Sequence, residues 1–388
     1  MNTIEKHFVE KIIEKIFTKK LIVFGTGSLC DNLLMLNMPS PDLFIDNDVK
    51  KVGKYKKNIK IQSPDFILSM NKKDIFIIVA SSYYNEISDQ LFQFGLIENY
   101  HYINGEIIYE YLLLFEKEKN LRRINISLSK GVLAKRDDVS AYDTRSWEYS
   151  VFSQNNEDGI IEHLLSKIYK DRNNYFIEIG ASNGVENNSS FLAIVKKYSG
   201  IMIEGVGIFS RQCAQLMNDF NIGVECKNLF VKKGNIGRIK EWSIYENPDF
   251  FSIDIDGNDY YILKELLELG LEPKVICVEY NSAYGPDKAL TIVYNDDFQL
   301  DNTYQSQLYY GASIKAWINL LERHGYKFIT VESNGVNAFF IKEKYFLSQD
   351  FINIKNIPFE ENFFQLRLYK GNWKEQFQLI KDREFFEC

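Results

Sequence analysis

Short apolar runs alternate with helix-compatible stretches along the first hundred residues of the chain. The runs LIVF before Gly25, DLFIDND (residues 42–48) and DIFIIVASS (residues 74–82) predict strands, and the last is apolar enough to be a parallel strand covered on both faces. The segment YYNEISDQLFQFGL predicts a helix that ends at Gly95. This alternation indicates an α/β fold with half of a doubly wound sheet. Ahead of it, the apolar stripe of residues 4–17 is more typical of a docking helix than of a membrane-surface helix.

A second alternation begins near residue 150 and predicts another α/β domain. The stretch SQNNEDGIIEHLLSKIY predicts a helix with an acidic first turn, and ASIKAWINLLERHGY predicts a later helix. Between them lie five predicted strands: NYFIEIG (174–180), GIMIEG (200–205), GVECKNLFV (223–231), DFFSIDIDG (249–257) and KVICVEYN (274–281). The segments KFITVES and VNAFFIKE predict an antiparallel hairpin, because Asn334-Gly335 between them supplies the positive φ angles of a tight turn.

These patterns divide the chain into four segments. Residues 1–110 are predicted to be a smaller N-terminal Rossmann-like accessory domain and residues 111–148 a helical linker. Residues 149–345 are predicted to be the second α/β domain, and residues 346–388 an aromatic-rich extension. Because the extension has no regular period, it could pack on a domain, contact another subunit or cover an active site. Homo-oligomerisation stays open for the same reason.

Composition removes several classes of protein. The 388 residues are 45% hydrophobic and 26% charged, which supports buried cores along the whole length. A net charge of −7 argues against nucleic acid as a partner. Five scattered cysteines without a CxxC pair fit reduced thiols better than a disulfide framework or a zinc site. With no apolar run near 18 residues and acids inside the first apolar stretch, we expect a cytoplasmic protein without a membrane span.

The most informative motif is a strand, a glycine loop and a helix at Glu178-Ile179-Gly180-Ala181-Ser182-Asn183-Gly184. A glycine at a strand end lets the backbone turn sharply and approach a ligand closely. About 24 residues beyond Gly180, Glu204 ends the next strand, where a carboxylate can accept both hydroxyls of a ribose. The structural alternative is a tight turn followed by a solvated strand end.

Acids gather at the ends of two further strands. Asp254, Asp256 and Asp259 follow one strand, and Glu279 ends the next. Since carboxyl ends of neighbouring parallel strands converge on one crevice, Asp254, Asp256 and Glu279 are candidate ligands of a hard divalent cation, with Asp256 also a candidate base. Capping of the next helix and contact with cofactor or substrate are the alternatives.

His324 is a further candidate for this site, as a base or as a ligand of iron(II). It stands in ERHGY at a predicted helix C-terminus, where a histidine also interacts favourably with the helix dipole.

The order of these features favours S-adenosylmethionine over NAD as the cofactor. A class I methyltransferase has an acidic glycine loop after its first strand, an acid after its second and an antiparallel hairpin at the end of its sheet. Several blocks of this chain resemble the FkbM-type family of S-adenosylmethionine-dependent methyltransferases over roughly residues 150–345. The blocks are SQNNEDGIIEHLL, FIEIGASNGVENNSSFLA, IMIEG, FFSIDIDGNDYYILKEL, VICVEYN, YGASIKAW and GVNAFF.

The resemblance implies a class I methyltransferase (Rossmann-like) domain with a terminal β-hairpin that methylates a hydroxyl of a sugar. Together with the accessory domain, it implies a nucleotide-activated sugar, such as a GDP-heptose, of capsule or surface polysaccharide assembly, with iron(II), Mg or Mn assisting. The implied cofactor-binding residues are Glu178, Gly180, Ala181, Ser182, Asn183, Glu204 and Asp254. The sequence GVGIF after Glu204 departs from the commoner polar residue of the family, which leaves adenosine recognition open.

Polar residues beside these blocks are candidates for substrate contact. They are Asn281, Tyr284, Tyr310 and Ser313. Hydroxyl and amide groups suit a sugar, and an aromatic face can pack on a sugar ring.

The N-terminal domain carries a second glycine motif, Gly25-Thr26-Gly27, with Asp46 about 20 residues on. Cys30 replaces the third glycine of the dinucleotide fingerprint. This motif supports two alternative functions: an NAD-dependent sugar oxidoreductase that uses the GTG site, and a non-catalytic protein for nucleotide binding or assembly.

Overall fold

The computed structural model describes residues 12, 15–16, 18–36, 38–133, 139–298, 300 and 306–388. The chain divides into two compact units, Met1–Arg123 and Ile124–Cys388. Most of the docking helix predicted at 4–17 lies outside the described residues. Within the described ranges, no helix combines the length and the apolar character that crossing a bilayer requires.

The first unit has the doubly wound sheet that its apolar runs predict. The strand order is β3-β4-β2-β1-β5-β6, and all neighbours are parallel except β3 and β4. Alternate residues of β1 enter apolar clusters on opposite faces, one with α2 and α4 and the other with α3. The elements are β1 (Lys20–Phe24), α2 (Ser28–Leu34), β2 (Leu43–Ile45), β3 (Tyr55–Lys56), β4 (Ile59–Gln62), β5 (Ile75–Val79), α3 (Tyr84–Gln93), β6 (Tyr102–Asn104) and the first part of α4 (Gly105–Leu133), which continues past Arg123 into the second unit.

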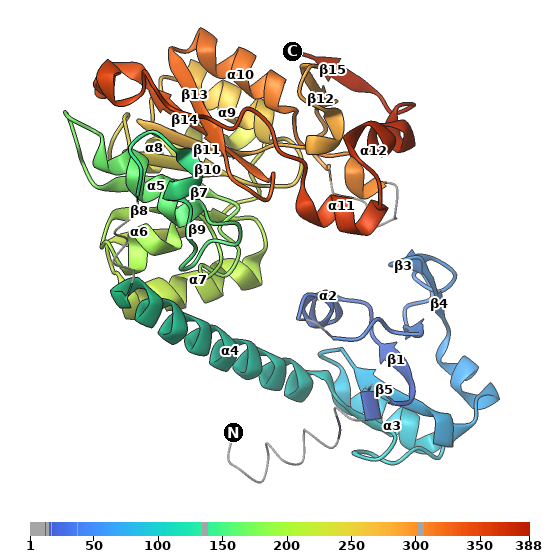
Figure 1. Cartoon of the computed structure of the whole chain (residues 1–388). Helices are drawn as coiled ribbons and strands as arrows, with labels where there is room; N and C mark the ends of the chain where they lie inside the picture. Colours follow the sequence, from blue (N-terminus) through green and yellow to red (C-terminus); the bar gives the residue numbers. More distant parts are fainter. Residues whose placement is uncertain are drawn as a thin grey trace. The chain divides into compact units, whose positions relative to one another are not determined.

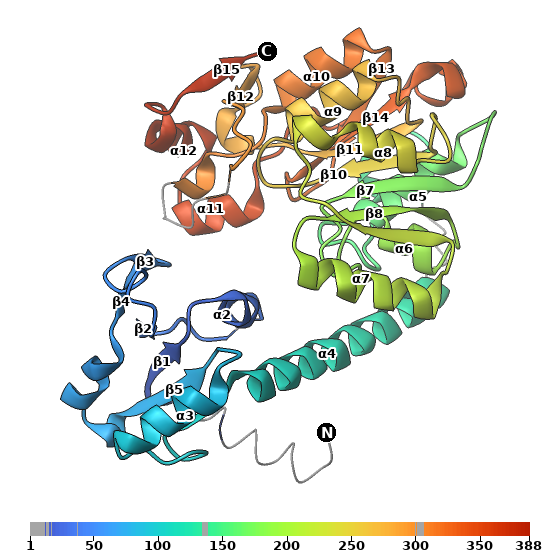
Figure 2. The same ribbon diagram turned by 180° about the vertical axis from the view of Figure 1, so that it is seen from behind.

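The second unit is built on a seven-stranded sheet, shown from two sides in Figures 1 and 2. The order is β13-β14-β11-β10-β7-β8-β9, in which β14 runs antiparallel to both neighbours and the other strands are parallel to one another. The five predicted strands and the terminal hairpin are therefore confirmed. The strands are β7 (Tyr175–Ile179), β8 (Ser199–Glu204), β9 (Val224–Asn228), β10 (Phe250–Ile253), β11 (Val275–Glu279), β13 (Tyr326–Val331) and β14 (Asn337–Lys342).

Helices cover both faces of this sheet, because successive strand residues point to opposite sides. Phe176 and Phe250 pack in one cluster with α5, α6 and α7, whereas Ile177 and Phe251 pack in another with α8, α9 and α10. These helices are α5 (Glu157–Ser166), α6 (Ser190–Ile194), α7 (Gly207–Phe220), α8 (Gly237–Trp242), α9 (Asp259–Glu268) and α10 (Ile314–Arg323).

The hairpin turn differs from the predicted tight Asn-Gly turn. The loop between β13 and β14 has five residues, and only Gly335, with φ +70°, adopts a positive φ. The Glu332 carboxylate closes the loop by accepting the backbone N–H groups of Val336 (2.6 Å) and Asn337 (2.8 Å). The buried Glu332 carboxylate therefore accepts N–H groups that backbone carbonyl oxygens would accept in a tight two-residue turn.

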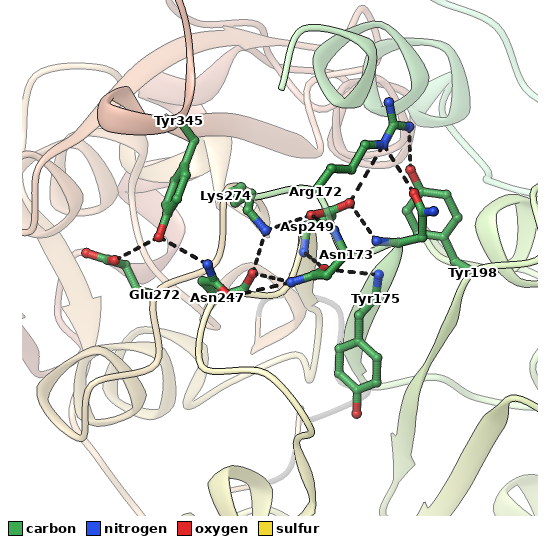
Figure 3. Close-up of polar contacts among 10 residues, drawn as sticks. Arg172, Asn173, Tyr175, Tyr198, Asn247, Asp249, Glu272, Lys274 and Tyr345 are labelled. Atoms are coloured by element: carbon green, nitrogen blue, oxygen red, sulfur yellow. Dashed lines mark hydrogen bonds and ion pairs between the residues drawn. The ribbon is translucent and has the colours of Figure 1, made fainter. Parts of the chain in front are cut away.

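An ion pair fixes the amino edge of the sheet, opposite the glycine loop (Figure 3). Asp249 precedes β10 and Lys274 precedes β11; Lys274 Nζ lies 2.7 Å from Asp249 Oδ1, and neither side chain is exposed. Asp249 also accepts the N–H groups of Asn173 (3.1 Å) and Asn174 (2.9 Å), just before β7. One carboxylate thus ties together the starts of three neighbouring strands.

The aromatic-rich extension packs back on its own unit. It contains α11 (Phe363–Tyr369), α12 (Trp373–Ile380) and β15 (Phe385–Glu387). β15 pairs antiparallel with β12 (Leu290–Ile292), and residues of α12 join an apolar cluster with Tyr284.

Candidate functional site

The glycine loop after β7 brings three strand ends together. Gly180 has φ +92°, and a Cβ atom there would lie 1.8 Å from the carbonyl oxygen of Asp254, at the end of β10. The N–H groups of Gly180 and Ala181 both donate to the carbonyl oxygen of Ile203 in β8 (2.9 and 3.1 Å). Only glycine permits this approach, so the backbone forms a narrow crevice at the carboxyl edge of the sheet.

Glu204 binds the glycine loop at the rim of the crevice. Its Oε2 accepts the N–H of Ser182 (2.8 Å), and its Oε1 accepts the N–H of Val206 (2.6 Å). Burial raises the pKa of Glu204, and these backbone bonds oppose the rise. A carboxylate has about four acceptor positions, so Glu204 retains capacity for ligand hydroxyls. Asn183 also lines the pocket, with its Oδ1 accepting the N–H of Val185 (3.1 Å).

Glu178 lies deeper, in strand β7 just before the loop. It is fully buried, and its Oε2 accepts the hydroxyl of Ser189 at 2.5 Å. Burial raises the pKa of Glu178 to about 8, so its carboxyl group holds a proton near neutral pH. Ala181 is buried behind the loop and is not part of the pocket lining, so only its backbone contributes to the loop.

Three acids from two strand ends form a cluster, as the sequence predicts. Asp254, Asp256 and Glu279 each offer an oxygen, and these oxygens all lie within 4.8 Å of one another. Two ligands on opposite sides of a hard cation at 2.0–2.6 Å would lie roughly 4–5 Å apart, so the spacing fits such an ion.

The energetics of the cluster also fit a cation. Burial, followed by the mutual repulsion of these charges, raises the pKa values of Asp254 and Glu279 well above their usual range. Glu279 is 9% exposed, and its Oε2 has no hydrogen-bond partner among the described residues. Because an unpaired buried carboxylate is costly, Asp254, Asp256 and Glu279 are suited to hold a divalent cation.

The turn that carries Asp256 is strained and firmly held. Asp256 has φ +54°, a left-handed conformation that is uncommon for a non-glycine residue. Asp259 accepts the N–H groups of Ile255 (2.8 Å) and Gly257 (2.9 Å) on either side of it. Asp259 therefore shapes the turn, while the Asp256 side chain reaches solvent at the pocket.

These residues line one pocket of about 660 Å³ at the carboxyl edge of the sheet. Seven acidic residues line it, of which Glu178 holds its proton near neutral pH, and the described lining residues include no lysine or arginine. The acids are Glu157, Glu178, Glu186, Glu204, Asp254, Asp256 and Glu279. The pocket is therefore complementary to a cationic ligand and opposes an anionic one.

The pocket includes residues that sequence reasoning missed. Glu157, at the start of α5, is buried; its Oε1 accepts Asn337 Nδ2 (2.8 Å) and its Oε2 accepts the N–H of Asn155 (2.6 Å). Asn362 and Phe364 reach the pocket from the C-terminal extension. The only sequence signal for Glu157 was the polar run SQNNED before an apolar helix.

His324 does not reach this pocket, so its predicted role as a base or iron ligand in the acid cluster is corrected. It lies between α10 and the start of β13, which runs parallel to β11. The start of β13 is therefore at the amino edge of the sheet, opposite the acids. His324 lines a different pocket there with Glu272, Tyr326 and Lys342.

Three of the predicted substrate contacts are buried and bound within the protein. Asn281 caps a helical turn through the N–H of Ala283 (3.0 Å) and donates to Leu308 and Tyr310 carbonyls. Ser313 caps α10, and the Tyr284 hydroxyl donates to the Tyr310 carbonyl (2.9 Å). These residues are outside the pocket lining because capping and core packing occupy them.

The fourth candidate, Tyr310, stands behind the acid cluster. Its side chain is 5% exposed, its hydroxyl accepts Gln365 Nε2 (3.1 Å), and its interaction with Glu279 opposes the rise in that residue's pKa. Tyr310 is therefore placed to support Glu279 rather than to contact a ligand.

The GTG motif of the first unit also lies at a strand-end crevice, in a cavity of about 730 Å³ between the loops that follow β1 and β5. Asp46 accepts the N–H (3.0 Å) and hydroxyl (2.5 Å) of Thr26, and Lys51 Nζ lies 3.0 Å away. Although burial opposes it, these bonds lower the pKa of Asp46. The ribose-binding acid predicted here thus holds its own glycine loop, and nucleotide binding stays a prediction.

The chain is similar to one family model over part of its length and to several solved structures. Residues 17–103 match the family model "C2185-like, N-terminal". No curated protein matches the chain. An O-methyltransferase from Bacillus cereus in complex with SAH is similar at 14% identity, with 57% of this chain and 89% of that chain covered and a TM-score of 0.34. The precorrin-6y C5,15-methyltransferase from Geobacter metallireducens GS-15 is similar at 14% identity, with 47% and 85% covered and a TM-score of 0.29.

The N-terminal domain of EvdMO1 with SAH bound is similar at 13% identity, with 48% of this chain and 80% of that chain covered and a TM-score of 0.33. The strand order of the second unit, its antiparallel β14 and the glycine loop after β7 define a class I methyltransferase fold.

Proposed function

We propose that the protein is an S-adenosylmethionine-dependent O-methyltransferase. The observation that carries this proposal is the pocket beside Gly180 and Glu204, lined by seven acidic residues and, among the described residues, by no basic side chain. S-adenosylmethionine carries a positive sulfonium and an ammonium group, which this pocket attracts. NAD carries a negative pyrophosphate, which the same acids would repel.

The residues divide between the two ends of the cofactor. Glu204 would accept the ribose hydroxyls, and the crevice made by Gly180 would admit the methionine portion against Ser182 and Asn183. Glu157 and the protonated Glu178 form the floor of the pocket. Binding in this orientation directs the sulfonium methyl group toward the second set of acids, at the ends of β10 and β11.

Methyl transfer then requires an oxygen nucleophile in line with the carbon–sulfur bond. A divalent cation, when bound, lowers the pKa of a coordinated hydroxyl and fixes its position. Asp254, Asp256 and Glu279 would hold the cation, and Asp256, the most accessible of the three, would accept the hydroxyl proton. The oxygen forms a bond to the methyl carbon while the carbon–sulfur electrons return to sulfur, which leaves a neutral thioether.

The acceptor in this proposal is a sugar hydroxyl. Its support is the resemblance of the sequence blocks to FkbM-type enzymes, which extends the proposal to a nucleotide-activated sugar such as a GDP-heptose and to capsule or surface polysaccharide assembly. Iron(II), Mg and Mn are the candidate cations.

Calorimetric titration of the full chain with S-adenosylmethionine, S-adenosylhomocysteine and NADH tests the cofactor. We expect the first two to bind, and Glu204→Gln to weaken them at least tenfold. Glu241→Gln, an exposed acid on α8, is the matched control and should change nothing. Tight NADH binding without S-adenosylmethionine binding would overturn the proposal. Mass spectrometry of a sugar panel incubated with each cation should then show a gain of one methyl group.

A further inference from the structure

The C-terminal extension supplies an unusual surface to the pocket: an exposed aromatic ring. Phe364, in the first turn of α11, is 57% exposed although it lines the pocket. Its neighbour Asn362 caps the helix by accepting the N–H groups of Phe364 (2.9 Å) and Gln365 (3.1 Å). The ring therefore projects from a capped, ordered helix start.

The backbone under Phe364 is anchored to the strand end that carries Glu279. The Tyr280 hydroxyl donates to the Glu360 carbonyl (2.6 Å), and the N–H of Asn362 donates to the Ser282 hydroxyl (2.8 Å). Tyr280 directly follows Glu279 in the chain, and Ser282 is three residues beyond it. The backbone just before the Phe364 ring is thus bound to the strand end that carries part of the acid cluster.

An exposed aromatic ring on an anchored backbone is well suited to bind a ligand. Burying an aromatic side chain contributes much to binding, and little conformational freedom is lost when its backbone is already ordered. Asp254, Asp256 and Glu279 line the same pocket, and their carboxyl oxygens can accept hydrogen bonds from the hydroxyl groups of a ligand. A pyranose ring has both properties, an apolar C–H face and a rim of hydroxyls.

The charge of the pocket lining limits which ligand groups can enter the pocket. The acidic residues of the lining other than the protonated Glu178, without a basic residue among the described lining, oppose a phosphate group inside the pocket. A bound divalent cation would offset only two of the negative charges. The part of the acceptor that reaches the reacting methyl group is therefore uncharged, and any phosphate it carries stays outside.

We propose that Phe364 is the acceptor platform: the apolar face of an uncharged pyranose ring packs on it while a hydroxyl meets Asp254, Asp256 and Glu279. This inference rests on the proposed function for its chemistry, but it concerns binding of the acceptor and can be tested separately. It also assigns the extension to the active site.

The test compares Phe364→Ala with Phe363→Ala in the full chain. Phe363 is the matched control because it is adjacent, 48% exposed and absent from the pocket lining. Saturation-transfer NMR with a panel of methyl pyranosides reports ring contact without turnover. We expect wild type and Phe363→Ala to saturate the C–H protons of at least one glycoside, and Phe364→Ala to lose most of that signal. Phe364→Trp should retain it.

Binding of S-adenosylhomocysteine separates this inference from the proposed function. Phe364→Ala should bind it within twofold of wild type, and the KM for an active glycoside should rise about tenfold. Equal effects of the two alanine variants, or absence of any glycoside signal in wild type that binds S-adenosylhomocysteine, would overturn the platform. Phe364-dependent glycoside binding without S-adenosylhomocysteine binding would keep the platform and overturn the proposed cofactor.

Discussion

Replacing Gly180 by alanine perturbs the point where three strand ends meet. The added Cβ would lie 1.8 Å from the Asp254 carbonyl oxygen, whereas ordinary contacts begin near 3.4 Å. The obstacle is backbone, so it cannot rotate away as a side chain would. The φ of +92° adds strain, because an alanine rarely adopts it.

The steric clash and the backbone strain together give the expected loss of stability. A left-handed conformation costs a non-glycine residue roughly 1–2 kcal/mol, and overpacking typically costs about 1–3 kcal/mol. We therefore expect Gly180→Ala to lower the free energy of unfolding by roughly 2–5 kcal/mol, or the melting temperature by roughly 5–15 °C for a unit of this size. Separation of the β7 and β10 loops should also abolish S-adenosylhomocysteine binding.

Urea unfolding followed by tryptophan fluorescence measures this loss in the correct unit, since all four tryptophans lie within Ile124–Cys388. Gly234→Ala is the matched control: it is in the same unit, and its added Cβ would meet nothing within 4 Å. The control should stay within about 0.5 kcal/mol of wild type. If Gly180→Ala unfolded at the same urea concentration as Gly234→Ala, the steric reasoning about the crevice would be refuted.

Three further predictions concern charged groups. Lys274→Met should lower the free energy of unfolding by about 3–5 kcal/mol, because it leaves the buried Asp249 carboxylate without the lysine ammonium group. The double variant Asp249→Asn/Lys274→Met should recover part of this loss in the same unfolding measurement. If the single variant were as stable as wild type, the role of the pair would be contradicted. Burial raises the pKa of Glu178 from 4.5 to about 8, so the native state keeps a proton that the unfolded chain releases, and this group makes stability fall as pH rises from about 4.5 to about 8. Glu178→Gln should therefore gain stability relative to wild type between pH 5 and pH 8, whereas parallel pH curves would show that Glu178 titrates normally. Asp254→Asn should weaken Mn²⁺ binding at least tenfold by calorimetry, while Asp219→Asn on the exposed side of α7 should leave it unchanged; equal binding by both variants would remove Asp254 from the cation site.

Much of the fold could be predicted because each part has a local signal. Strands such as β5 and β7 are short apolar runs, and Gly180 marks a strand end where the chain must turn. The acid cluster followed from a second rule, that parallel strands end at the same edge. Asp254 and Glu279 could thus be brought together from the sequence alone, although no contact between them is local.

The errors arise where position depends on the whole topology. His324 was placed with the acids because its residue type suited them, but the direction of β13 puts it at the other edge of the sheet. Asn281 and Ser313 have the right chemistry for a substrate and are used for capping instead. Phe364 was part of an aromatic tail whose position the sequence left open, because its anchors come from residues about 80 positions earlier in the chain.

The uniform sign of the pocket charge bears on turnover as well as on affinity. In the proposed reaction the sulfur of the cofactor changes from a cation to a neutral thioether, so the acids that attract the donor attract the spent form less strongly. If that proposal holds, the charge of the pocket favours the donor over its by-product, although both carry the same ammonium group. Added salt, which screens the carboxylates, narrows the difference between the two forms.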